Sequence, residues 1–156
     1  IRACVVAAFV LGFWSCDSAR IYEVNTELND QNWLADSVKQ YSFSISDTLS
    51  AHNILCNIRN SGSYPFRNIY VKYMLLDSSG SELSGGLVNR ELFEAKSGKP
   101  TGKGLGDVQD HSFPLVDNYT FPYKGNYHVS IAQYMRRDTL PNIVAVGVRV
   151  ERALDE

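Results

Sequence analysis

The sequence predicts an all-β protein with a single β-sandwich domain of jelly-roll-like form. Apolar and polar residues alternate with a period of two in several segments, as strands with one face on a core require. Turn residues separate these segments at spacings of about ten residues, which is typical of sandwiches. Aromatic residues make up 12% of the chain, and no helical period persists between Tyr41 and Glu156.

The individual strands follow from this alternation. The first expected strand contains Tyr41, Phe43 and Ile45, which alternate with serines. Segment 68–76 is apolar on both faces, so we expect a central strand there. Residues 133–140 are expected to form a loop. Further strands are expected at residues 54–58, 81–88, 91–95, 127–131 and 144–150.

The N-terminal residues predict a lipid-anchored protein. The apolar run at residues 3–15 is too short to span a bilayer as a helix, which needs about 20 residues. We therefore interpret residues 1–15 as a cleaved lipoprotein signal segment whose own start precedes Ile1. Cys16 follows a small residue and precedes a polar stretch, as in a bacterial lipobox, and it is the predicted lipidation site. A signal peptide cut elsewhere is the alternative, although Phe-Trp-Ser before Cys16 is not an A-x-A-like site.

A polar tether is expected between the anchor and the domain. Residues 16–38 hold the lipidated cysteine and a polar segment, which would start the domain about 20 residues from the membrane. Trp33 marks the place where this segment docks. The sandwich domain is thus expected at residues 39–156.

Charge and cysteine content argue against several other classes. The net charge is −2 and the pI is near 5.9, and no basic cluster indicates nucleic-acid binding. Cys4 leaves with the signal segment and Cys16 is acylated, so Cys56 has no partner for an intramolecular disulfide. Because Cys56 lies in an alternating segment, we expect a buried thiol that behaves as a small hydrophobe.

No motif indicates catalysis, a cofactor or a metal. The glycine-rich segment 98–107 lacks the spacing of a phosphate-binding loop, so we interpret it as a mobile hairpin or crossover. None of His52, His111 and His128 has a second ligand at a metal-binding spacing. No serine lies in a nucleophile elbow. The sequence therefore favours a non-enzymatic protein.

Several segments, in order, resemble the gliding motility lipoprotein family GldH of the Bacteroidetes. These are the lipobox at Cys16, WLADSVKQYSFSISD at 33–47, NIRNSGSYPFRNIYVKY at 57–73, GKGLGD at 102–107, and GNYHVSIAQYMRRDTL followed by VGVRVE towards the end. The resemblance implies a non-enzymatic outer-membrane lipoprotein that acts as an assembly or scaffold component of the gliding motility and type IX secretion machinery. It also implies partners among other envelope lipoproteins and components of that machinery, besides the membrane itself.

Two groups of residues are candidates for partner binding. The first is Lys99, Lys103 and Asp107 in the glycine-rich segment. The second is Met135, Arg136 and Arg137, for which solvated charge at a strand end is the alternative interpretation. A different function, glycan binding in a polysaccharide-capture system, would use exposed aromatic residues. Tyr119, Phe121 and Tyr123 alternate and could form such a platform, although packing on the core explains them equally well.

The phylum that the resemblance implies suggests two further expectations. Its exported proteins are O-glycosylated at Asp followed by Ser or Thr and an apolar residue, and Thr48 and Thr139 are the sites we expect among the matches in this chain. Its surface-exported lipoproteins carry an acidic cluster after the lipidated cysteine, whereas Asp17 is followed here by Ser18, Ala19 and Arg20. We therefore expect the domain to face the periplasm.

Overall fold

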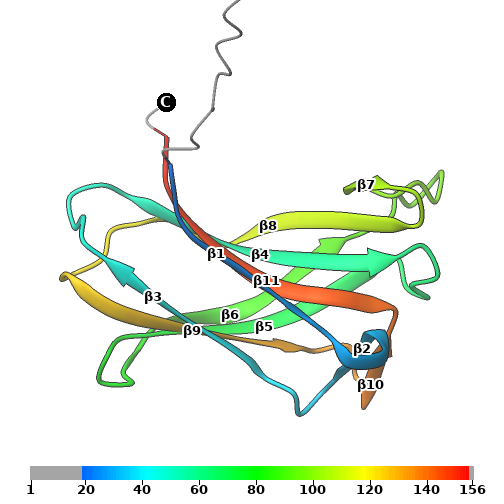
Figure 1. The fold of residues 1–156 in the computed structure, drawn as a ribbon, viewed down its shortest axis with the longest axis horizontal. Helices are drawn as coiled ribbons and strands as arrows, with labels where there is room; N and C mark the ends of the chain where they lie inside the picture. Colours follow the sequence, from blue (N-terminus) through cyan, green and yellow to red (C-terminus); the bar gives the residue numbers. More distant parts are fainter. Residues whose placement is uncertain (1–18, 155–156) are drawn as a thin grey trace, which may run out of the picture.

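The computed structural model describes residues 19–154, and within them nearly all regular structure is β-strand (Figure 1). The signal segment and Cys16 lie outside the described residues. In chain order the elements are β1 (Arg20–Glu27), η1 (Asn29–Gln31), β2 (Asn32–Leu34), β3 (Lys39–Ile45), β4 (His52–Ser61), β5 (Asn68–Leu76), β6 (Glu82–Glu91), β7 (Lys103–Leu105), β8 (Val108–Tyr119), β9 (Gly125–Gln133), β10 (Thr139–Pro141) and β11 (Ile143–Arg152). No helix in this part of the chain is long and apolar enough to cross a membrane.

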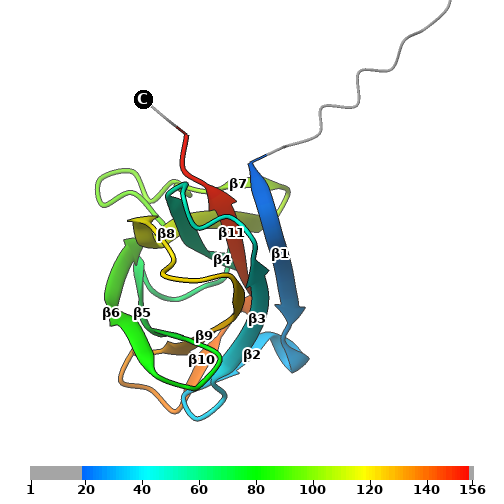
Figure 2. The same ribbon diagram turned by 90° about the vertical axis from the view of Figure 1, so that its left-hand side faces the viewer.

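The strands form two antiparallel sheets that pack face to face (Figure 2). The five-stranded sheet has the order β1-β11-β4-β8-β7, and the four-stranded sheet has the order β3-β9-β5-β6. The short strands β2 and β10 pair with each other beside them. The predicted fold class, an all-β sandwich, is confirmed.

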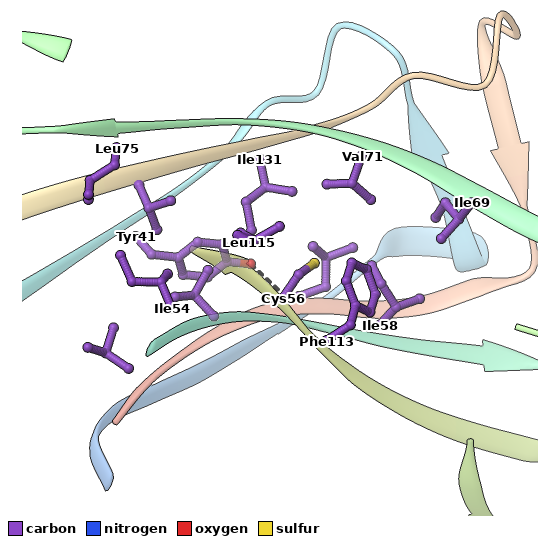
Figure 3. Packing of buried hydrophobic residues seen from close by; sticks show 14 of the residues in the cluster. Tyr41, Ile54, Cys56, Ile58, Ile69, Val71, Leu75, Phe113, Leu115 and Ile131 are labelled. Atoms are coloured by element: carbon purple, nitrogen blue, oxygen red, sulfur yellow. Dashed lines mark hydrogen bonds between the residues drawn. The ribbon is translucent and has the colours of Figure 1, made fainter. Parts of the chain in front are cut away.

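Alternating side chains build the core between the sheets. Ile54, Cys56 and Ile58 of β4 are buried from the five-stranded sheet, opposite buried residues of β5 and β9 (Figure 3). Tyr41 of β3 crosses the core, and its hydroxyl donates to the backbone oxygen of Val146 on β11 at 2.6 Å. Burial raises the pKa of the free Cys56 thiol, so the thiol stays protonated. The expectation that Cys56 packs as a hydrophobe is confirmed.

The strands β8 and β6 differ from the sequence expectation. β8 was not expected, although it is longer than any other described strand, because Pro114 interrupts its pattern and proline is disfavoured inside a sheet. The ladder between β8 and β4 shifts register near Ile54, and Leu55 then lies opposite Pro114. β6 is one strand at 82–91, whereas two shorter strands were expected.

The prediction of a polar tether at residues 16–38 is wrong for most of that range. Residues 20–27 form β1, which pairs along the edge of β11, and residues 32–34 form β2. The sequence of β1 resembles a linker because an edge strand needs few buried side chains. Its main contact with the core is Tyr22, whose ring centroid lies 5.9 Å from that of Phe43. The folded domain thus begins by Arg20, four residues after Cys16. Trp33 is fully buried, as its predicted docking role requires.

The strand directions give the sandwich two distinct ends. The terminal end carries the start of β1, the end of β11 and the connections 46–51, 77–81 and 120–124. The loop end carries the connections 62–67, 92–107 and 134–142. Figure 1 shows the start of β1 and the end of β11 well away from the β7 hairpin.

Candidate functional site

The loop end gathers both groups of residues that were predicted to bind partners. Lys103 and Asp107 flank the tip of the β7–β8 hairpin, where Gly106 takes a φ of 68°. Leu105 at this tip is 94% exposed. The backbone N–H of Gly62 donates to the Asp107 carbonyl at 2.7 Å. The hairpin is therefore braced against the β4–β5 connection, and part of the segment interpreted as mobile is regular strand.

The second group lies in the β9–β10 connection and is partly ordered by the protein. The Met135 sulfur accepts a hydrogen bond from the Tyr70 backbone N–H at 3.1 Å. The Arg137 guanidinium lies 5.5 Å from the centre of the Phe66 ring, within the range of a cation–π contact. Arg136 is exposed, with a φ of 56°.

The β4–β5 connection joins the two groups. It contacts the first group through Gly62 and the second through Phe66. Lys99 is exposed in the β6–β7 connection at the same end. The structure thus brings together residues that lie up to 38 positions apart in the sequence, from 99 to 137.

The aromatic residues of the glycan-binding alternative do not share an exposed face. Phe121 is 1% exposed, and its ring lies 5.0 Å from that of Tyr119 and 4.5 Å from that of Tyr127. Tyr123 is partly exposed but stacks on Tyr127 at 5.4 Å. Core packing is therefore the correct interpretation of Phe121, and the three residues form no platform.

The two expected glycosylation sites lie at opposite ends. Thr48 is half-buried at the terminal end, where the carboxylate of Asp47 accepts hydrogen bonds from Leu49 and Ser50. These bonds hold the pKa of Asp47 well below its usual range. Thr139 is exposed in β10 near the loop end.

A polar groove on the outer face of the five-stranded sheet was missed by the sequence analysis. Its volume is about 440 Å³. A sequence signal existed, because Asn57 and Arg59 alternate with the buried residues of β4, but the partners come from strands that are distant in the chain. The side chains that these strands contribute include Glu23, Asn25, Asn57, Arg59, Asp110 and Ser112.

A hydrogen-bond network fixes the side chains along this groove. Asn57 Nδ2 donates to Glu23 Oε1 at 2.9 Å and to Asn25 Oδ1 at 3.1 Å. Ser112 Oγ donates to Asn57 Oδ1 at 2.9 Å. Between β1 and β4 lies Gly147 of β11, whose missing side chain leaves room for Asn25 above it.

The other end of the groove lies under the β6–β7 connection. Arg90, Thr101, Gly102, Lys103 and His111 contribute to its lining there. His111 is 5% exposed, and its Nε2 atom has no hydrogen-bond partner. Burial lowers the pKa of His111, and the charge of Arg90 lowers it further. His111 is therefore neutral at pH 7.

Comparisons with known proteins agree on one family. A family model described as GldH lipoprotein matches residues 20–150. The gliding motility lipoprotein GldH homolog of Christiangramia forsetii is 28% identical over 155 residues, which cover 92% of this chain and 91% of the relative. Gliding motility lipoprotein GldH of Flavobacterium johnsoniae is 25% identical over 159 residues, which cover 95% and 93%.

Solved structures show weaker likenesses. The infectious bursal disease virus VP2 subviral particle matches with a TM-score of 0.40 at 12% identity, over 93% of this chain and 37% of that chain. The Tobacco streak virus coat protein matches with a TM-score of 0.25 at 12% identity, over 86% and 88%. At these TM-scores the likenesses carry no argument.

The antiparallel sheets define an all-β sandwich protein. Among residues 19–154, no three His, Cys, Asp or Glu side chains gather as a metal site. The chain belongs to the GldH lipoprotein family. The resemblance seen in the sequence is thereby confirmed, and a lipoprotein family implies membrane attachment in the cell envelope.

Proposed function

We propose that this protein is a non-enzymatic outer-membrane lipoprotein that acts as an assembly or scaffold component of the gliding motility and type IX secretion machinery. Its curated relatives are gliding motility lipoproteins. The observation that carries the proposal is the clustering of exposed residues at the loop end, away from the start of β1 (Figure 1). Other envelope lipoproteins and components of that machinery are the proposed partners.

The position of β1 limits how far the domain stands from its anchor. Arg20 is four residues after Cys16, and four extended residues span at most about 14 Å. With Cys16 lipidated, the terminal end therefore stays near the lipid while the loop end points away from it. We propose that the domain faces the periplasm in this orientation, where Thr139 beside the loop end is the more accessible glycosylation site and Thr48 lies nearer the membrane.

The first prediction concerns docking of partners at the loop end. The double variant Leu105→Arg, Arg137→Glu should lower recovery of other gliding lipoproteins about tenfold or more, because a few central interface residues dominate binding energy. Recovery is measured by co-purification from detergent-solubilised membranes after crosslinking in cells. Lys72→Glu, on the exposed face of β5, is the charge control and should leave recovery unchanged. Equal recovery with the double variant and the wild type would contradict docking through this end.

Attachment through Cys16 makes a second prediction. Cys16→Ser removes the acceptor thiol, and without acyl chains the protein loses the apolar burial of about 0.8 kcal/mol per methylene that holds it in the membrane. The variant should leave the outer-membrane fraction, as measured by sucrose-gradient fractionation and immunoblotting. A Cys56→Ala variant should stay in the membrane. Retention of fully processed Cys16→Ser would overturn the anchor.

A further inference from the structure

We propose that the groove on the five-stranded sheet binds an anionic, hydroxyl-rich ligand, namely an acidic saccharide. This site lies apart from the aromatic residues of the glycan-binding alternative, and one of its ends reaches the proposed docking end through Lys103. Its lining comes from β1, β11, β4 and β8, from Arg90 of β6 and Lys103 of β7, and from the β6–β7 connection. Its volume of about 440 Å³ falls within the range of ligand sites, about 300–1,000 Å³.

The charge of the groove favours an anion. Its lining includes the four cations Arg59, Arg90, Lys103 and Arg149 but only the two carboxylates Glu23 and Asp110, although the whole chain has a net charge of −2. Arg59 is held by Asp110 at 2.7 Å, and Arg149 by Glu151 at 2.6 Å.

Arg90 and Lys103 supply the excess positive charge. Within residues 19–154 neither has a carboxylate within ion-pair distance. The Arg90 guanidinium instead lies 6.0 Å from the centre of the Phe113 ring, which orients it without neutralising it. These two residues, both exposed, can donate charge-assisted hydrogen bonds to a carboxylate or phosphate of the ligand.

The rest of the groove suits the hydroxyl groups of a saccharide. Asn25, Asn57 and Ser112 are held in a shared network, so their remaining donors and acceptors have fixed positions. Preorganised polar groups lower the entropic cost of binding.

The lining argues against a peptide or a lipid tail. Ile58 and Ala145 are the apolar residues of the lining, and they are only 1% and 3% exposed. A peptide side chain or an acyl chain would therefore find no exposed apolar side chain to pack against there. The charged and polar side chains of the lining favour a ligand that binds through hydrogen bonds and charge, as an acidic saccharide does.

Isothermal titration of the purified protein tests the proposal with two probes of equal ring number. Trigalacturonate, which carries carboxylates, should bind, and neutral maltotriose should bind at least about tenfold more weakly because it cannot form charge-assisted hydrogen bonds. Arg90→Gln and Lys103→Gln should each raise the Kd for trigalacturonate about tenfold for the same reason. Higher salt should weaken binding of the acidic probe.

Lys99→Gln is the matched control, because Lys99 is exposed in the β6–β7 connection, between Arg90 and Lys103 in the sequence, but does not line the groove. It should bind trigalacturonate as the wild type does. Thermal unfolding confirms that each variant is folded. Equal binding of both probes, unchanged Kd in the Arg90 and Lys103 variants, or no trigalacturonate binding at about 1 mM would overturn the proposal. No partner protein is present, so the result is independent of the docking test.

Discussion

The variant Phe121→Ala should lose about 3–5 kcal/mol of its free energy of unfolding, the usual cost of truncating a buried aromatic residue. Phe121 is 1% exposed and lies in the connection between β8 and β9. Its ring contacts four others, at centroid distances of 4.5 Å to Tyr127, 5.0 Å to Tyr119, 5.3 Å to His52 and 5.9 Å to Phe43. Removing it opens a cavity beneath this cluster at the terminal end.

Urea denaturation followed by circular dichroism measures this loss. Phe121→Leu keeps much of the side-chain volume and should lose less free energy than the alanine variant. Tyr134→Ala is the control for an exposed aromatic residue, since Tyr134 is 54% exposed, and it should change the free energy of unfolding by less than about 0.5 kcal/mol. A loss below about 1 kcal/mol for Phe121→Ala would mean that the ring is not part of the core.

The alternation of apolar residues is sufficient to predict the strands that bury a row of side chains, including the edge strand β3. Tyr41, Phe43 and Ile45 point to the core from β3, and the same period identifies β4, β5, β9 and β11. In these strands the hydrophobic pattern itself determines which face is buried, so local sequence carries the information. The family resemblance was also visible, because it rests on the order of such segments.

Strands that bury few side chains, or that a proline interrupts, carry less of this signal. β1 has one neighbour and buries few side chains, so its polar sequence reads as a linker. β8 keeps His111, Phe113 and Leu115 on the core side, but Pro114 between them argues against a strand. Both strands form because long ladders to β11 and β4 supply their backbone hydrogen bonds.

The candidate sites depend on contacts between distant segments. Lys103 and Arg137 belong to separate segments of the sequence, and the contacts of the β4–β5 connection show that they share an end of the molecule. The groove requires the register that places Asn57 beside Gly147 and Ser112. Sequence periodicity predicts which residues face outward, and it does not predict which strands are neighbours.

The last prediction concerns Gly147 in β11 and the link between the anchor and the domain. A Cβ atom at Gly147 would meet the Val24 backbone oxygen at 2.5 Å and would clash with the side chain of Asn25. Both belong to β1, which pairs with β11 alone. Gly147→Ala should therefore displace β1 and cost at least about 3 kcal/mol, the upper part of the range for overpacking, because backbone is in the way.

Hydrogen exchange locates the effect, because amides of residues 20–27 should exchange much faster in Gly147→Ala than in the wild type. Gly86→Ala in β6 is the matched control: its nearest contact is the Tyr73 side chain at 3.3 Å, so β1 should stay protected. Once β1 is released, more than the three residues between Cys16 and Arg20 separate the anchor from the folded part. A protease added to membrane vesicles that expose the domain should then cut within 20–27. If the amides of β1 stay protected in Gly147→Ala, β1 does not approach β11 as closely at this position as the structure indicates. The inference of a short link between the anchor and the domain would then fail as well.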